Sequence, residues 1–170
     1  MTIFNVRTVK LQPGEQFRDV KEVALEPLAL GGQRYVPIPE SSEAALTLSR
    51  LTSGLMLELD LDVRLVGPCM RCLVDTGISL EVHGREYQAT SPGEDADELT
   101  TPYLADDRLD LSAWARDAVA LSLPDKILCR PDCAGLCPEC GRDLNAEPHE
   151  HENEAVDSRW AVLGELKDRL

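Results

Sequence analysis

Aromatic and basic residues are scarce in this chain. Its 170 residues include only two Trp, three Tyr and two Phe, and 17 Lys and Arg stand against 31 Asp and Glu, for a formal net charge of −14. Proteins that bind single-stranded nucleic acid without sequence preference ordinarily stack bases on aromatic side chains in a basic groove. The composition therefore disfavours that class and favours a basic protein as the partner.

Long apolar runs are also missing. A membrane span needs roughly 20 consecutive apolar residues, and no run in the sequence approaches that length. The start, MTIFNVRTVKLQPGEQF, has neither the uninterrupted apolar stretch nor the small-residue cleavage site of a secretory signal. We therefore expect a cytoplasmic protein with no membrane association. Because cytoplasmic thiols are kept reduced, its six cysteines indicate metal binding before disulfides.

Common catalytic motifs are absent as well. The sequence holds no HExxH, GxSxG, P-loop or GxGxxG pattern. Closed, thiolate-rich metal sites are structural, whereas a catalytic zinc keeps an open coordination position. The sequence thus predicts a protein that is not an enzyme, and an enzyme with an open zinc or a reactive thiolate is the less favoured alternative.

Alternating apolar and polar residues predict a long β-hairpin. In residues 55–65 Leu and Val occupy every second position, and the pattern returns in residues 78–84, with the sequence CMRC between the two runs. Shorter β-like runs occupy residues 3–6, 20–26 and 45–48. The segment DLSAWARDAVALSLP has one apolar helical face, Asp110 or Ser112 as N-cap and Pro124 as stop signal.

We therefore expect an α+β fold. It would be an antiparallel β-rich single domain over residues 1–170, with a long β-hairpin, one or two covering helices and zinc-knuckle elements. Within it, residues 91–107 hold six acids and are predicted to form an acidic flexible loop without secondary structure. Residues 129–151 are predicted to form a zinc-knuckle segment, and residues 157–170 a C-terminal helix.

The cysteines and two of the histidines follow the spacing of metal ligands. Cys69 and Cys72 are separated by two residues, as are Cys137 and Cys140, and such a CxxC knuckle lets one tight turn aim both sulfurs at a tetrahedral ion. The remaining candidates are Cys129 and Cys133, four apart, and His149 and His151, which fall on the same face of an extended segment.

Eight candidate ligands suffice for two zinc sites of four ligands each. The favoured first site consists of Cys69, Cys72, Cys129 and Cys133. The favoured second site consists of Cys137, Cys140, His149 and His151. One alternative joins the two CxxC knuckles in a single zinc ribbon and leaves Cys129 and Cys133 spare. Another leaves His149 and His151 in a solvated acidic stretch.

The motifs CMRCL, LPDKILCRPDCAGLCPECGRDLN and DSRWAVLGELKDRL together resemble the YceD family of large ribosomal RNA accumulation proteins. The resemblance covers most of the chain, is strong from Leu55 onward, and places the family's recurring cysteines on all six cysteines here. Many relatives follow the LN step with a CxC pair, whereas this chain has His149-Glu150-His151. The family implies a cytoplasmic, bacterial or plastid factor that large-subunit (23S) rRNA needs in order to accumulate.

Two noncatalytic functions fit these features. In the first, an assembly factor acts on the large ribosomal subunit precursor through a basic large-subunit ribosomal protein, using the acidic loop and the sheet surface. In the second, a zinc module binds rRNA directly, with Arg71, Arg130 and Arg142 contacting phosphate. The net charge of −14 favours the first.

Overall fold

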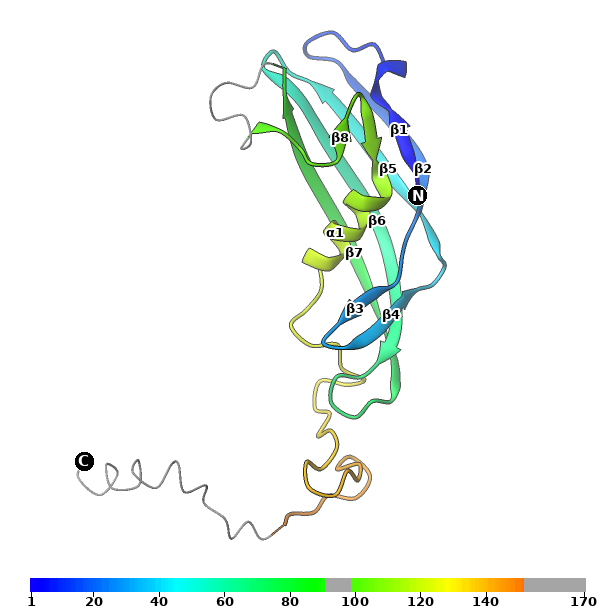
Figure 1. Cartoon of the computed structure of the whole chain (residues 1–170), viewed down its shortest axis with the longest axis vertical. Coiled ribbons are helices and arrows are strands. Elements are labelled where there is room, and N and C mark those ends of the chain that lie inside the picture. The colour runs from blue at the N-terminus through cyan, green and yellow to red at the C-terminus, as the bar shows by residue number, and fades with distance from the viewer. Residues whose placement is uncertain (91–98, 152–170) are drawn as a thin grey trace, which may run out of the picture.

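The computed structural model describes residues 1–90 and 99–151, and its main element is an antiparallel sheet (Figure 1). Four strands lie side by side in the order β2 (Gln16–Ala24), β5 (Ser41–Arg50), β6 (Gly54–Pro68) and β7 (Asp75–Ala89). Beyond the end of β5, β6 pairs with β4 (Gln33–Pro37), which in turn pairs with β3 (Leu28–Leu30). The mostly antiparallel β structure confirms the predicted fold class.

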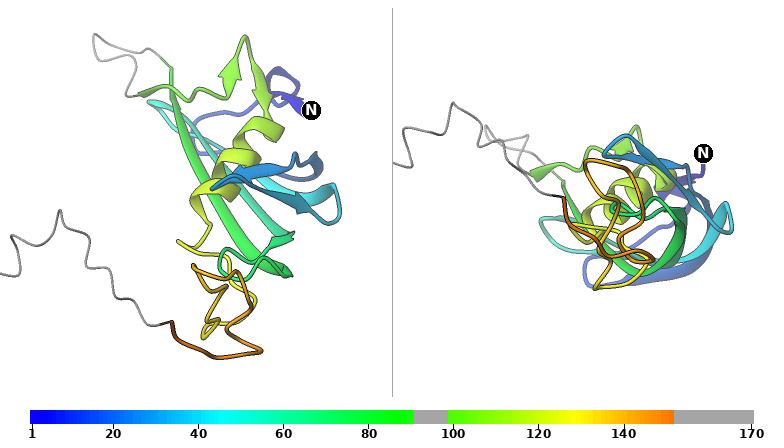
Figure 2. Two further views of the ribbon diagram at one scale, coloured as in Figure 1. Left: turned by 60° about the horizontal axis from the view of Figure 1, so that its bottom comes forward. Right: turned by 90° about the horizontal axis from the view of Figure 1, so that it is seen from below.

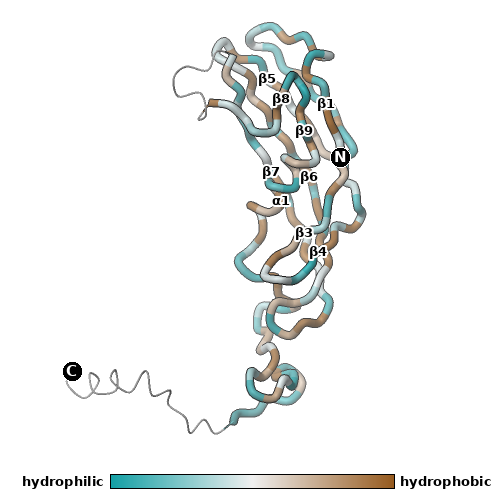
Figure 3. The backbone as a smooth tube through the Cα atoms, in the orientation of Figure 1, coloured by the Kyte–Doolittle hydropathy of each residue, from teal (hydrophilic) through white to brown (hydrophobic). Residues whose placement is uncertain are grey.

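The predicted long hairpin is the longest element of the sheet. β6 and β7 pair without interruption from Gly54 opposite Ala89 to Pro68 opposite Asp75, and CMRC lies at the tip. The odd-numbered residues 57–65 of β6 are buried, as the alternation predicted. Figure 3 shows the corresponding mixture of hydrophobic and hydrophilic positions along the strands.

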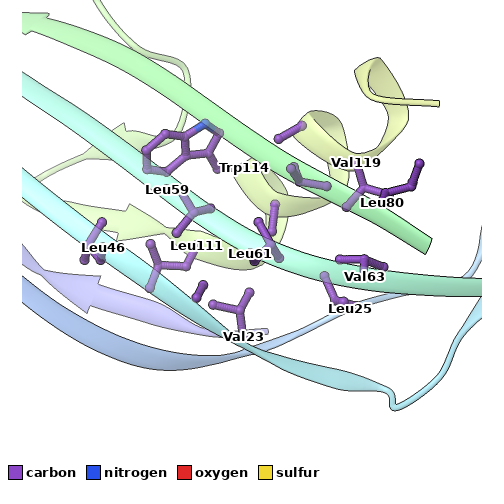
Figure 4. Close-up of a cluster of buried hydrophobic side chains, with 14 of the residues drawn as sticks. Val23, Leu25, Leu46, Leu59, Leu61, Val63, Leu80, Leu111, Trp114 and Val119 are labelled. Atoms are coloured by element: carbon purple, nitrogen blue, oxygen red, sulfur yellow. The ribbon is translucent and has the colours of Figure 1, made fainter. Parts of the chain in front are cut away.

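Among residues 1–90 and 99–151, one helix covers the buried face of this sheet. Helix α1 (Leu111–Leu121) begins at Asp110, whose side chain accepts a hydrogen bond from the backbone N–H of Ala113. The apolar face predicted for this segment is buried, and it consists of Leu111, Trp114, Ala115, Ala118 and Val119. Seen end-on, the sheet curves around the helix (Figure 2). Figure 4 shows Trp114 and Val119 packed against Leu59, Leu61 and Val63 of β6.

The close contact between α1 and β7 requires a glycine at position 84. A Cβ atom added there would lie 2.9 Å from Nε1 of the buried Trp114 ring. We expect Gly84→Val to lower the free energy of unfolding by about 1–3 kcal/mol because the ring must shift. Gly77→Val is the matched control, since Gly77 is exposed on the same strand and its nearest new contact is at 3.4 Å. Equal denaturant midpoints for the two variants would contradict this packing.

A small second sheet lies beside the N-terminal part of α1. Its strand order is β1 (Ile3–Asn5), β9 (Arg108–Asp110) and β8 (Leu104–Ala105), and a single 3-10 turn, Val6–Thr8, follows β1. The expectation of no secondary structure over residues 91–107 is therefore wrong at 104–105. Asp106 and Asp107 both take positive φ angles, which suit the two-residue turn that joins β8 to β9.

Two predicted segments have no described counterpart, and two observed strands have no predicted one. The predicted C-terminal helix, 157–170, and residues 91–98 of the acidic loop lie outside the described residues. Strands β3 and β4 were not predicted, because Gly31-Gly32 and the prolines at 37 and 39 are typical of turns rather than strands. No helix among residues 1–90 and 99–151 is long and apolar enough to cross a membrane.

Candidate metal centres

The first cluster of thiols forms where the hairpin tip meets the segment after α1. At the tip, the backbone N–H of Cys69 donates to the carbonyl of Val74 and that of Leu73 donates to the carbonyl of Cys69. The N–H of Met70 bonds the carbonyl of Ile127 at 2.9 Å, which brings the chain after α1 alongside. Cys129 and Cys133 thereby come to lie against Cys69 and Cys72.

The sulfur positions suit a tetrahedral ion. Sγ of Cys69 lies 3.8 Å from that of Cys133, and Sγ of Cys72 lies 3.6 Å from that of Cys129. Zinc–sulfur bonds of about 2.3 Å in a tetrahedron separate sulfurs by about 3.8 Å, whereas a disulfide brings them to about 2.05 Å. Cys69, Cys72 and Cys133 are buried and Cys129 is exposed. The cluster therefore has the donor set and the spacing of a closed, four-thiolate site.

The electrostatics of this cluster also favour a cation. Burial alone would raise the pKa of Cys69, but the backbone N–H groups of Cys72, Arg71 and Cys129 outweigh it and lower that pKa to about 6. The pKa of Cys129 is raised to about 12, first by its side-chain contact with Cys72 and then by burial. One thiolate thus forms readily, and its negative charge disfavours deprotonation of the neighbouring thiols. A cation at the centre is therefore needed for all four to be deprotonated.

The second cluster is local to residues 137–151. The N–H of Gly141 donates to the carbonyl of Cys137 at 2.9 Å, the same bond that Leu73 makes to Cys69 in the first knuckle. Gly141 and Leu73 also share a left-handed backbone, with φ of 71° and 62°. The CPECG and CMRCL sequences therefore form the same type of turn, with glycine at the left-handed position in the first and leucine in the second.

His149 is oriented for ligation by its own backbone. Its Nδ1 lies 2.8 Å from the carbonyl of Glu147, and its Nε2 lies 3.1 Å from Sγ of Cys140. A ring nitrogen fixed on a carbonyl leaves the other free to bind a metal. The backbone hydrogen bond to Glu147 and the contact with Cys137 raise the pKa of His149. Backbone N–H groups, that of Cys140 first, lower the pKa of Cys137 to about 6.

The structure gathers the eight candidates into two groups with the predicted membership, and each could hold a metal ion. The groups are Cys69, Cys72, Cys129 and Cys133, and Cys137, Cys140, His149 and His151, and within each group the donor atoms all lie within 4.8 Å of one another. The single ribbon of two CxxC knuckles does not form. His83, by contrast, lies outside both groups, exposed on β7 and paired with Asp60.

Asn145 is a residue of this region that sequence reasoning missed. Its Oδ1 accepts hydrogen bonds from the N–H of Ala134 and from Arg130, both at 2.8 Å, and its Nδ2 lies 3.5 Å from Sγ of Cys133. One side chain from the second cluster's segment therefore supports the first cluster. The only sequence signal was the LN step after the last cysteine, which carries no metal-ligand chemistry of its own.

The arginines beside the cysteines have partners within the chain. Arg71 donates to the carbonyl of Cys133 at 2.6 Å, Arg130 contacts Asp132 as well as Asn145, and Arg142 contacts Glu147. Of the three, Arg130 joins the segments of the two clusters through Asn145, whereas the contact of Arg71 lies within the first cluster and that of Arg142 within residues 137–151.

Comparison with known proteins gives a family match across both clusters. The model of YceD, described as large ribosomal RNA subunit accumulation protein YceD, matches residues 57–167. Uncharacterized proteins of Mycobacterium tuberculosis and Mycobacterium bovis are 36% identical over 139 residues, covering 71% of this chain and 67% of theirs. YlbN of Bacillus subtilis is 27% identical over 100 residues, 58% of each chain. No solved structure matches. The resemblance seen in the cysteine motifs is confirmed, and the chain belongs to the YceD family.

Proposed function

We propose that this protein is a noncatalytic, cytoplasmic factor in biogenesis of the large ribosomal subunit, supporting the synthesis, processing or accumulation of 23S rRNA. The observation that carries the proposal is the family match over residues 57–167, a range that contains all eight candidate ligands. The thiolate-rich donor sets support a structural rather than a catalytic role, because they leave no ligand position for a substrate.

Both clusters bind zinc in this proposal. The first site consists of Cys69, Cys72, Cys129 and Cys133, and the second of Cys137, Cys140, His149 and His151. Bound zinc joins the hairpin tip to the chain after α1 and folds residues 137–151 into a second knuckle. Its contribution is therefore to folding, since sites of this kind are not formed in the unfolded chain.

The proposed partner is the large-subunit precursor, contacted through a basic ribosomal protein. The net charge of −14 supports a basic partner because the summed field attracts cations and repels phosphate. Direct rRNA binding through Arg71, Arg130 and Arg142 has less support, since each of these side chains already has a partner within the chain.

Depletion of the protein tests the proposed function. We expect mature 23S rRNA to fall relative to 16S rRNA, because only the large subunit would lack its factor. The measurement is the ratio of the two rRNAs, with sucrose-gradient sedimentation of the tagged protein at low and high salt. An unchanged ratio, or a protein that never sediments with large-subunit particles, would contradict the ribosomal function. It would not affect the assignment of the metal clusters.

A further inference from the structure

The outer face of the main sheet has no covering element among the described residues. Helix α1 and the small sheet lie on the buried side, and in β2 every even-numbered side chain from Gln16 to Glu22 is exposed. The same face of β7 carries the exposed residues Ser79, Glu81, His83 and Arg85. A four-stranded surface is therefore available to a partner.

Four carboxylates cross this face in one row. Glu22 of β2 lies directly opposite Glu43 of β5, and Asp62 of β6 lies directly opposite Glu81 of β7. The pairing of Ala44 with Leu61 places Glu43 next to Asp62, so the four acids continue across all four strands. All four are exposed. We define Glu22, Glu43, Asp62 and Glu81 as the acidic row.

The acidic row is not neutralised within the described part of the chain. Its four carboxylates form no ion pair with residues 1–90 or 99–151, whereas the neighbouring Glu58 and Asp60 are paired with Arg85 and His83. Like charges directly opposite each other destabilise a sheet. The sheet therefore keeps two unfavourable cross-strand pairs that positive charge from outside would relieve.

A hollow adjoins the row at its β6–β7 end. It has a volume of about 410 Å³ and is lined by Ile38 and Pro39 together with Asp62, Arg64 and Glu81. Ile38 is 53% exposed, so its apolar side chain is accessible from the hollow. The hollow thus offers apolar contact next to the carboxylates.

We propose that the acidic row and this hollow form the docking surface for a lysine- or arginine-rich protein segment that carries apolar side chains. The inference rests on the proposed function and deepens it, because it states where the basic partner binds. Cationic side chains align with the row, and an apolar side chain enters the hollow beside Ile38. The negative field of the surface is also seen at His83, whose pKa is raised first by Asp60 and further by Glu81 and Asp62.

The test compares two variants that each lose four negative charges, at different positions. The first neutralises the row, as Glu22→Gln, Glu43→Gln, Asp62→Asn and Glu81→Gln. The control neutralises acids off this face, as Glu15→Gln, Glu26→Gln, Asp106→Asn and Asp125→Asn. The probe is a fluorescently labelled peptide of alternating lysine and leucine, measured by anisotropy across a salt series. We expect the row variant to bind at least about tenfold more weakly than the control.

The row variant is also expected to melt at or above the wild-type temperature, because its like-charge pairs are gone. Equal weakening in both variants, or binding of an RNA oligonucleotide but not the peptide, would overturn the docking surface. If the row variant restores 23S rRNA in depleted cells as well as the control does, the inference fails and the proposed function stands. If depletion leaves rRNA unchanged, the function fails and the peptide measurement still decides the surface.

Discussion

Cys69→Ser is expected to destabilise the fold much more than Cys137→Ser. Both thiols are almost fully buried and both belong to a cluster of four candidate ligands. The first cluster, however, joins residues about 60 positions apart and fixes the hairpin tip to the chain after α1, whereas the second closes a local loop. We expect a loss of about 3 kcal/mol or more for Cys69→Ser, as for the loss of other structural metal sites.

Thermal melts of the two variants and of the wild type measure this difference. A loss of about 3 kcal/mol corresponds to a decrease in Tm of about 6–12 °C for a chain of this length. The Cys137→Ser variant serves as the matched control, since it also removes one buried sulfur. Similar decreases in Tm would show that the two clusters contribute equally and would contradict the topological argument.

Protein purified without added metal is expected to contain about two zinc ions per chain. The ions should leave in two steps on addition of a chelator. Three of the four donors in the first cluster are buried, whereas Cys140 and His151 of the second are exposed. The second site should therefore release its ion first, because water and chelator reach it more easily.

Elemental analysis gives the ratio, and a chromogenic chelator follows the release. In Cys137→Ser protein the early step should disappear and leave a ratio near one. A wild-type ratio near one would mean that the second cluster holds no zinc. A ratio of zero would contradict the structural role of metal. A single release step in wild-type protein would mean that the two clusters are coupled, for which Asn145 is the connecting side chain.

Local patterns predicted the hairpin, the helix and the membership of both clusters. The β6–β7 hairpin follows from strict alternation, because one buried face fixes the register of a strand. Helix α1 follows from its apolar face and the cap at Asp110. The candidate ligands follow from their spacing, which favoured these two sets but also allowed a single ribbon of the two CxxC turns. The contact between the hairpin tip and the chain after α1 brings Cys129 and Cys133 to the first set.

Features that depend on distant contacts were not predictable in the same way. β4 contains Pro37 and pairs with only a short part of β6, and its Tyr35 is fully buried in the core among residues distant in sequence. The acidic row also depends on the registers of the β2–β5 and β5–β6 pairs, which the sequence does not specify. The role of Asn145 depends on two loops meeting, and side-chain to backbone bonds of that kind leave no periodic signal.

The β6–β7 hairpin also determines how far apart the two ends of the sheet lie. Fifteen consecutive pairs of residues at about 3.3 Å each make a ladder of roughly 50 Å. It runs from the candidate metal clusters at one pole to Gly54 and Ala89 at the other, without a break in the pairing. A partner bound at the metal clusters and a partner bound on the outer face of the sheet would therefore be held at a fixed distance and orientation to each other.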